Sequence, residues 1–198
     1  MATISSCITK EAKDKQIDTT TAFGRAWLLE KVDKLNPRPE DRAKILKDRE
    51  LQRTQIMVGR MYFFRYDPKT KDTLPYWDIY PIVIPIEPYR NGFLGLNLHY
   101  IYPKDRLILL TQLQNFATAS KGVENTRLRL SYPILKAYHQ AYRAKPCIKR
   151  YLYNHVMSRF SQIPGNEWNI AAALPVQQFK AEFSVQAEQV WRDSKRKY

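Results

Sequence analysis

The sequence has few cysteines, glycines and histidines, and these shortages exclude several common kinds of site. Its two cysteines, Cys7 and Cys147, lie far apart and match no metal-binding spacing, so we expect no disulfide framework. The six glycines form neither a phosphate-cradling Gly-Lys-Ser/Thr loop nor a dinucleotide-binding cluster. The three histidines, His99, His139 and His155, have no partner at i+4 and no nearby cysteine pair. We therefore predict neither a metal site nor a cofactor.

The chain also lacks a long apolar run. No stretch approaches the length that crosses a bilayer, and the N-terminal MATISSCITKEAKDK lacks the apolar core of a signal peptide. We therefore expect no membrane partner and a protein that acts inside the cell that makes it. Hydrophobic residues form 44% of the 198 residues, which suffices for one sizeable core.

Acidic residues are scarce relative to basic ones. The chain has 33 Lys and Arg against 19 Asp and Glu, which gives a net charge of +14. Such a surplus favours a polyanionic partner, chiefly nucleic acid, because Lys and Arg release counterions from a phosphate backbone. The alternative interpretation is a basic protein that its charge keeps in solution.

The N-terminal part is predicted to be an arm followed by two helices. Residues 1–20 are polar and unpatterned, which is typical of a flexible arm. Thr21 can cap a helix that continues to residue 35, and Pro39 can begin a second helix that ends near residue 53. We expect residues 21–198 to form a single globular domain that is helical over 21–53.

The stretch over residues 56–102 is aromatic and proline-rich, and it predicts three strands separated by turns. Its second strand contains three prolines, which remove backbone donors and indicate an edge strand or a bulged corner. We predict an α+β fold, with a small, strongly curled antiparallel sheet or SH3-like barrel over 56–102 surrounded by several α-helices. The prolines are Pro81, Pro85 and Pro88.

Glycines mark two positions in this β-element. Arg90-Asn91-Gly92 supplies a hairpin turn between the second and third strands. Gly95 lies inside the third strand, where a bulge or a close backbone approach is expected.

The remainder, residues 103–198, is predicted to be helical. Pro103 begins a helix with a wide apolar stripe, and further helices are expected from about Pro133, over 147–163 and over 176–198. The helix over 147–163 is inferred from apolar residues at four-residue spacing. These residues are Ile148, Leu152, Val156 and Phe160.

Aromatic and basic residues alternate through the β-element, and two interpretations of this pattern remain open. Exposed aromatic rings could stack on bases while the cations meet phosphates. Alternatively, Tyr62, Phe64 and Tyr66 form one face of a strand and belong to the core, with Phe63 and Arg65 pointing the other way.

Eight basic residues are the candidate phosphate contacts, although charges of this kind are also common on a solvated surface. They are Lys69, Lys71, Arg90, Lys104, Lys145, Lys149, Arg150 and Arg159.

Carboxylates offer the one route to metal-dependent nuclease chemistry, which needs acids that converge within a few ångströms. The candidates are Asp67, Asp72, Asp78 and Glu87. Asp67 precedes a proline and is explained as a turn former, and Asp78 as a residue at a strand start or in a salt bridge. We predict no catalytic residue, and we expect His99, in a strand beside aromatics, to have a structural role.

Four motifs resemble a known family when taken together. They are YDPK at 66–69, LPYWD at 74–78, GLNLHY at 95–100 and LPxxxF at 174–179. As a set they resemble the DNA end protector, or head and tail completion, group of small virion proteins from T-even-type tailed phages. The resemblance covers roughly residues 60–180, and the first sixty residues have no counterpart in it.

The resemblance implies a late structural protein, made in the host cytoplasm and located in the virion at the head–tail junction. Such a protein would bind the ends of packaged double-stranded DNA, shield them from exonuclease and help the tail to attach. Its other partners would be portal, neck, tail or baseplate proteins, and a ring of identical copies is one arrangement to test. The alternatives are a neck or baseplate assembly subunit that acts by protein docking and, less favoured, a metal-dependent nuclease.

Overall fold

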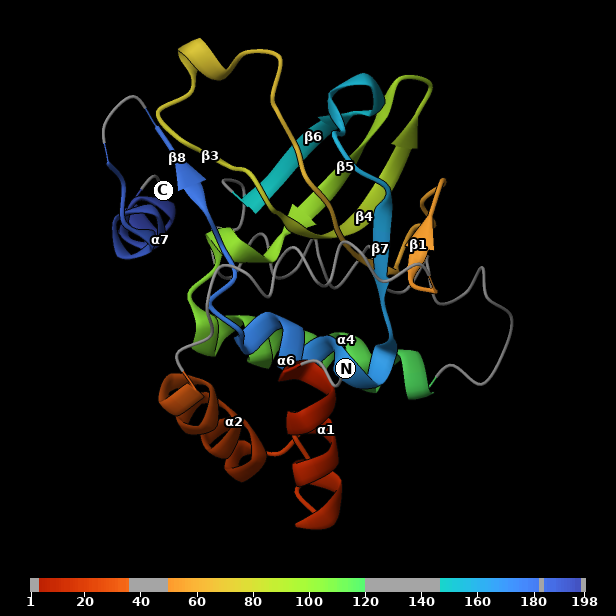
Figure 1. The fold of residues 1–198 in the computed structure, drawn as a ribbon, viewed down its shortest axis with the longest axis vertical. Coiled ribbons are helices and arrows are strands. Elements are labelled where there is room, and N and C mark those ends of the chain that lie inside the picture. Colours follow the sequence, from red (N-terminus) through yellow and green to blue (C-terminus); the bar gives the residue numbers. More distant parts are fainter. Residues whose placement is uncertain (1–3, 36–49, 120–146, 182–183, 197–198) are drawn as a thin grey trace.

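The computed structural model describes residues 4–35, 50–119, 147–181 and 184–196, and within them it confirms the mixed α+β fold (Figure 1). The larger sheet contains β1 (Gln52–Arg53), β2 (Met61–Phe63), β4 (Ile82–Tyr89), β5 (Gly92–Asn97), β6 (Ile148–Leu152) and β7 (Phe160–Ile163). A separate pair contains β3 (Trp77–Asp78) and β8 (Phe179–Lys180). The helices are α1 (Ile4–Asp14), α2 (Ala22–Leu35), α4 (Pro103–Ala119), α6 (Trp168–Ala173) and α7 (Ala187–Arg196). Short 3-10 turns are η1 (Lys71–Thr73), η2 (Leu98–Tyr100), η4 (Tyr153–His155) and η5 (Gly165–Glu167).

The larger sheet is open. Its strands pair antiparallel in the order β1-β7-β2-β4-β5-β6, so β1 and β6 are its edges. The sheet is neither closed nor strongly curled, so the barrel that the sequence suggested is not confirmed. Three of its strands come from outside the stretch 56–102 that was expected to form the sheet: β1 precedes it, and β6 and β7 follow it.

The predicted hairpin turn is confirmed. Of the two explanations offered for the prolines, the bulge is found and the edge strand is not. Tyr89 pairs with Gly92 across the turn, and the register shifts between Pro85 and Glu87, which is the expected bulge. The edge-strand expectation is wrong, because β4 lies between β2 and β5. On the side of β4 that faces β2, only Ile82 and Val83 are paired. Pro85 lies beyond this pairing, so its missing N–H removes no hydrogen bond to β2.

Gly92 and Gly95 permit two close approaches within the sheet. A Cβ atom at Gly92 would lie 1.9 Å from the carbonyl oxygen of Tyr151 in β6, and one at Gly95 would lie 2.3 Å from Cγ1 of Val83. Neither position has room for a side chain. At Gly95 the close neighbour is the Val83 side chain, and the expected bulge is found opposite it, where the register shifts after Pro85. The contact at Gly92 also allows β6 to pair closely along β5.

Both faces of the sheet are buried. Tyr62, Phe64 and Tyr66 lie in the aromatic cluster on one face, which confirms that they belong to the core. Phe63 points to the other face and packs in the larger core with the helices. The aromatic cluster comprises Tyr62, Phe64, Tyr66, Val83, Phe93, Tyr151 and Phe160. Phe64 is its centre, with ring centroids 5.0 Å from Phe160 and 5.4 Å from Tyr151.

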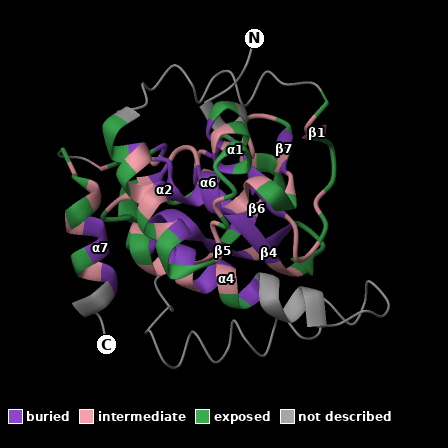
Figure 2. Cartoon of the chain, turned by 90° about the horizontal axis from the view of Figure 1, so that it is seen from below, coloured by how far each residue is buried: buried purple, intermediate pink, exposed green. Residues whose placement is uncertain are grey.

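The helices form the second layer (Figures 1 and 2). Helices α4 and α6 run side by side beneath the sheet, and α1 and α2 pack on the outer side of α6. Seen from below, the buried residues gather toward the middle of the molecule, on the sheet and on α6 (Figure 2). Helix α2 begins as predicted, because the hydroxyl oxygen of Thr21 accepts a hydrogen bond from the Gly24 amide at 3.0 Å.

Three predicted segments require correction. Residues 4–14 are not a flexible arm but helix α1, whose Ile8 is buried in the main core with 1% of its surface exposed. The helix expected over 147–163 is instead β6 and β7, because a four-residue spacing also places residues on one face of a strand. The last helix begins at Ala187, and β8 precedes it.

Other expectations fall on residues that lie partly or wholly outside the described ranges. The helix expected from residue 39 is described only over 50–53, where a turn and β1 are found. The helix expected from about Pro133 and the candidate Lys145 lie wholly outside these ranges. Among the described helices, none has both the length and the apolar character needed to span a bilayer.

Candidate nucleic-acid interface

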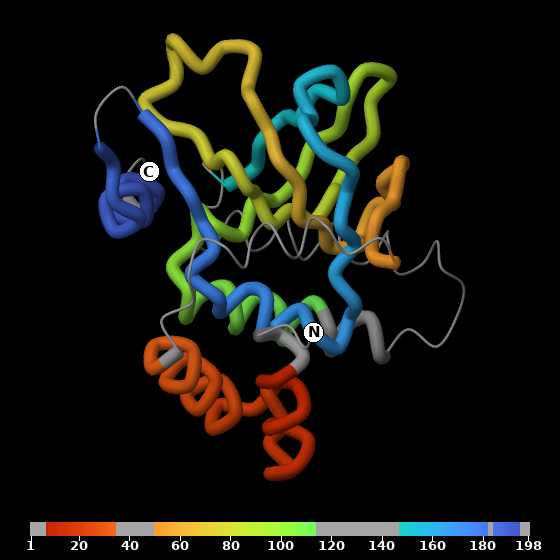
Figure 3. Tube along the Cα trace, viewed as in Figure 1, coloured from red at the N-terminus to blue at the C-terminus, as the bar shows by residue number. Residues whose placement is uncertain are grey.

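Three of the predicted basic residues line one pocket of about 500 Å³. It lies between the edge strand β6 and the segment 66–78, which arches over the sheet and returns as β3 beside β8 (Figure 3). We call it pocket A. Its cations are Lys69, Lys149 and Arg150, and its aromatic lining includes Tyr66, Tyr76, Trp77, Tyr100 and Tyr151.

Strand pairing places the two cations of β6. Lys149 lies opposite Gly95 and Arg150 opposite Leu94 of β5. The Lys149 ammonium lies 4.3 Å from the centroid of the Tyr100 ring. The Arg150 guanidinium lies 5.2 Å from that of the Tyr89 ring and donates a hydrogen bond to Asn91 Oδ1 at 3.0 Å. Aromatic faces attract cations, so these contacts hold both charges at the pocket wall.

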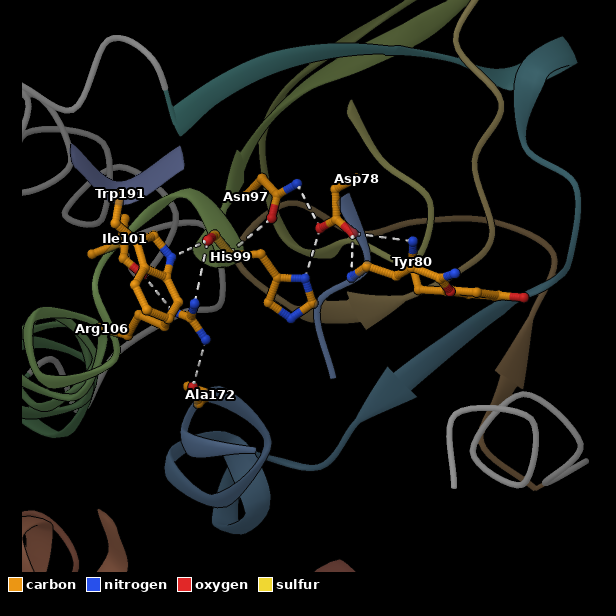
Figure 4. Close-up of polar contacts among 9 residues, drawn as sticks. Asp78, Tyr80, Asn97, His99, Ile101, Arg106, Ala172 and Trp191 are labelled. Carbon is orange, nitrogen blue, oxygen red and sulfur yellow. Dashed lines mark hydrogen bonds and ion pairs between the residues drawn. The ribbon is translucent and has the colours of Figure 1, made fainter. Parts of the chain in front are cut away.

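The carboxylate that lines pocket A is already fully engaged in the protein interior (Figure 4). Asp78 is buried, and its Oδ2 lies 2.6 Å from His99 Nδ1 and accepts from Asn97 Nδ2 at 3.2 Å. Its Oδ1 accepts from the backbone amides of Tyr80 and Gln178 at 3.2 and 3.4 Å. Four donors to one buried carboxylate fix β3 against the end of β5. The structural role predicted for His99 is confirmed.

A buried arginine extends this network toward the helices. Arg106 of α4 donates to the carbonyl oxygens of Ile101, Ala172 and His99 at 2.6, 3.1 and 3.2 Å. Trp191 of α7 donates its indole N–H to the same His99 carbonyl at 2.9 Å. Burial lowers the pKa of Arg106 to about 9, so its guanidinium remains charged at neutral pH. The network thus joins β5, α4, α6 and α7 behind the pocket.

Burial also raises the pKa values of two tyrosines and of a cysteine near the pocket. It raises the pKa of Tyr76 to about 12, with smaller contributions from Asp193 and Cys147. It raises the pKa of Tyr100 well above its ordinary value, and the Asp78 charge adds to the effect. The pKa of the Cys147 thiol rises to about 12 for the same reason, so this buried cysteine is a poor nucleophile at neutral pH.

A second pocket, pocket B, adjoins the first and has a different charge balance. It has a volume of about 910 Å³, and Tyr66, Leu74 and Trp77 line both pockets. Its cations are Arg65, Lys71 and Lys180, and its acids are Asp67 and Asp72. Lys71 forms a salt bridge with Asp67 at 3.1 Å, and the Lys180 ammonium lies 5.9 Å from the centroid of the Trp77 ring.

The remaining predicted cations are scattered. Arg159 lines a third pocket, of about 580 Å³, together with Arg53. Arg90 is exposed in the β4–β5 turn, and Lys104 is exposed in the first turn of α4. Of the seven candidates within the described ranges, the structure brings together Lys69, Lys149 and Arg150 in pocket A. It places Lys71, Arg90, Lys104 and Arg159 elsewhere.

Of the four acids considered for a nuclease, only Asp67 and Asp72 line the same pocket, pocket B. Asp78 is used in the buried network, Asp67 pairs with Lys71, and Glu87 lies on β4 opposite Leu94. Within the described ranges, no three His, Cys, Asp or Glu side chains are grouped so that they could hold a metal ion.

Sequence reasoning missed several residues of this region. Assigning 147–163 to a helix hid the position of β6 beside segment 66–78. Lys180 was not singled out, and Arg65 was noted in the β-element but not included among the candidate phosphate contacts. Two features of the sequence could have indicated the buried network. Asn97 and His99 stand at the i, i+2 spacing of a side-chain turn, in which Asn97 Oδ1 accepts from the His99 amide at 2.9 Å. Arg106 directly precedes the apolar run of α4.

The fold and this site define an α+β protein with a cationic, aromatic-lined pocket at the edge of an open sheet. A scan against protein-family models matches the family described as Phage T4 terminal DNA protecting protein over residues 41–194. The match spans well over half of the chain, so the chain belongs to that family, as the four motifs indicated. Searches of curated proteins and of solved structures found no match.

Proposed function

We propose that this chain is a non-catalytic virion protein that binds the ends of packaged double-stranded DNA and shields them from exonucleases. Its membership of the terminal DNA protecting family over residues 41–194 carries the proposal. The net charge of +14 and the three cations of pocket A support it, since each supplies attraction to phosphate without any bond being made or broken.

The proposal includes a location and a set of neighbours. DNA ends in a tailed phage leave the head where the tail attaches, so we place the protein at the head–tail junction, after synthesis in the host cytoplasm. There it would contact portal, neck or tail proteins, and a ring of copies could surround the DNA. A map that places the chain elsewhere in the particle would contradict this part.

An exonuclease assay tests the protective role. A linear duplex is incubated with a processive exonuclease in the presence and absence of the purified protein, and full-length DNA is followed with time. We expect the protein to prolong the survival of the duplex, and the effect to weaken steeply as salt is raised. Digestion at the same rate with and without excess protein would contradict the proposal.

The same protein preparation tests the nuclease alternative. If the chain were a metal-dependent nuclease, DNA incubated with it and Mg²⁺ or Mn²⁺ would be cut, and Asp67→Asn or Asp78→Asn would abolish cutting. We expect the DNA to remain intact with either metal.

The second candidate function is docking to other virion subunits, as in a neck or baseplate protein. One observation favours it: residues 1–40 precede the family match, and Phe23 of α2 has 73% of its surface exposed. Single exposed apolar side chains are also common on proteins that bind no partner, so a binding experiment has to decide. Retention of the protein on purified portal or neck rings, lost with Phe23→Ser, would support docking. Strong ring binding without any DNA binding would favour docking over end protection.

A further inference from the structure

Pocket A combines two features that suit a single nucleotide more than the side of a duplex. Its volume of about 500 Å³ falls in the range of about 300–1,000 Å³ that is usual for small-ligand pockets. A duplex presents its phosphates on a convex surface. The end of a strand can extend a phosphate and its base into a concave site of this size, whereas an internal nucleotide must first be flipped out of the stack at a cost in free energy.

The cations of pocket A lie on two opposing elements. Lys149 and Arg150 come from β6, and Lys69 comes from the segment 66–78 that forms the other wall. Arg150 is exposed, is held by the Tyr89 ring and the Asn91 amide oxygen, and forms no described ion pair with a carboxylate. Arginine binds phosphate through two parallel N–H donors, so a preorganised guanidinium at this wall is suited to a phosphate group.

The aromatic part of the pocket is suited to a base. Tyr76 and Trp77 are half-buried, which leaves part of each ring open. Tyr76 packs against Tyr100 with ring centroids 6.0 Å apart, and Trp77 follows directly in β3. The Asp78 network anchors these rings from behind, so they need little rearrangement to meet a ligand. Stacking on fixed aromatic rings accepts any base, as a protein that meets varied DNA ends requires.

We propose that pocket A binds the terminal nucleotide of a DNA strand, with its end phosphate between Lys69 and the Lys149–Arg150 pair and its base against Tyr76 and Trp77. This inference rests on the proposed function, because it specifies which part of the DNA end the protein recognises. The protein would then recognise the strand terminus specifically. General electrostatic attraction would instead act equally along the whole duplex.

The test measures the affinity of the full chain for four DNAs of one sequence at fixed salt. They are a linear duplex with 5′-phosphates, one with 3′-phosphates, one without terminal phosphates, and one closed at both ends by hairpin loops. We expect the 5′- or the 3′-phosphorylated duplex to bind at least about fivefold more tightly than the dephosphorylated one, and the closed duplex to bind most weakly.

Two variants in pocket A and one control variant in pocket B localise the effect. Lys149→Gln with Arg150→Gln should abolish the preference for a terminal phosphate, and the exposed Lys69→Gln, which puts folding at little risk, should reduce it. Lys71→Gln with Lys180→Gln removes the same charge from pocket B and should retain the preference. Circular dichroism and urea unfolding verify that each variant is folded.

The outcomes separate the inference from the function on which it rests. Equal binding of phosphorylated and dephosphorylated linear duplexes, both tighter than the closed duplex, would overturn the assignment of pocket A and leave end protection standing. Equal binding of linear and closed duplexes would overturn both. A phosphate preference that persists in both the pocket A double variant and Lys69→Gln would also refute the assignment, because the phosphate would then bind elsewhere.

Discussion

Pockets A and B adjoin, share three lining residues and contain three cations each, yet they differ in what their acids do. In pocket A the one carboxylate, Asp78, is buried and bound by four donors. In pocket B the acids Asp67 and Asp72 lie beside the cations, and Asp67 pairs with Lys71.

The difference shows why a net charge of +14 does not by itself locate a polyanion site. Attraction to phosphate depends on the local excess of cations over acids at a surface, and on how far each cation is neutralised by its neighbours. Pocket A has three cations to one carboxylate and pocket B has three to two, so the local excess of cations is larger at pocket A.

The largest effect is expected from removing the buried carboxylate. Asp78→Ala leaves two buried side-chain donors, at Asn97 and His99, and two part-buried backbone amides, at Tyr80 and Gln178, without an acceptor. We expect a loss of at least about 3 kcal/mol in the free energy of unfolding, measured with urea. Asp67→Ala, in pocket B, removes only an exposed ion pair and should cost less than about 1 kcal/mol. Similar losses in the two variants would contradict the contrast.

The next largest effect concerns DNA affinity. Lys149→Gln with Arg150→Gln should weaken binding to a linear duplex at least about tenfold at moderate salt, and it should lower the log–log salt slope by about 1.8, or about 0.9 for each lost phosphate contact. The matched pair in pocket B, Lys71→Gln with Lys180→Gln, should weaken binding less than about threefold, because Lys71 is already paired. If the two double variants behaved alike, the pockets would not differ in function.

A smaller effect, of opposite sign, is expected from removing an acid of pocket B. Asp67→Asn frees Lys71 and removes one negative charge, so duplex affinity should rise about two- to threefold. Asp72→Asn removes the same charge without releasing a lysine and should raise affinity less. A rise of tenfold or more with Asp67→Asn would instead identify pocket B as the main phosphate site.

The smallest effect is the pH dependence of stability from Tyr76, at the wall of pocket A. Its pKa in the folded protein is about 12, above its ordinary value near 10, so the unfolded chain loses the proton first as pH rises. Stability from this group is therefore full below pH 10 and is lost between pH 10 and 12. Arg106 acts in the opposite direction above pH 9, because its folded pKa is lowered.

The comparison of wild type with Tyr76→Phe isolates the tyrosine. Urea midpoints at pH 8 and pH 11 should decline less in the variant than in the wild type, while the contribution of Arg106 is common to both proteins. An identical decline in the two proteins would show that the Tyr76 hydroxyl is not buried as described.

The sequence predicted the local parts of this fold better than its long-range pairings. The cap at Thr21, the hairpin before Gly92 and the bulge opposite Gly95 each follow from the backbone chemistry of one or a few residues, and all three are confirmed. The pairing of β6 with β5 depends on residues more than fifty positions apart, and the four-residue apolar spacing in 147–163 fits a strand as well as a helix.

For the candidate site, the sequence predicted the basic residues but not their arrangement. The sequence identified Lys69, Lys149 and Arg150 as basic residues but gave no reason to place them around one pocket, since that placement depends on β6. The Asp78 network was equally hidden, because its members lie on separate elements that meet only in the folded chain. Family membership could be predicted without the long-range pairings, because it depends on short local motifs.

Competition between linear and circular DNA tests the central claim most directly. Labelled linear duplex is bound to the protein at fixed salt and challenged with unlabelled DNA of the same sequence, either linear or as a relaxed closed circle. If the protein recognises DNA ends, the linear competitor displaces the label at far lower nucleotide concentration than the circle does. Equal displacement by the two forms would show that it binds duplex DNA without regard to ends, and the account would be wrong.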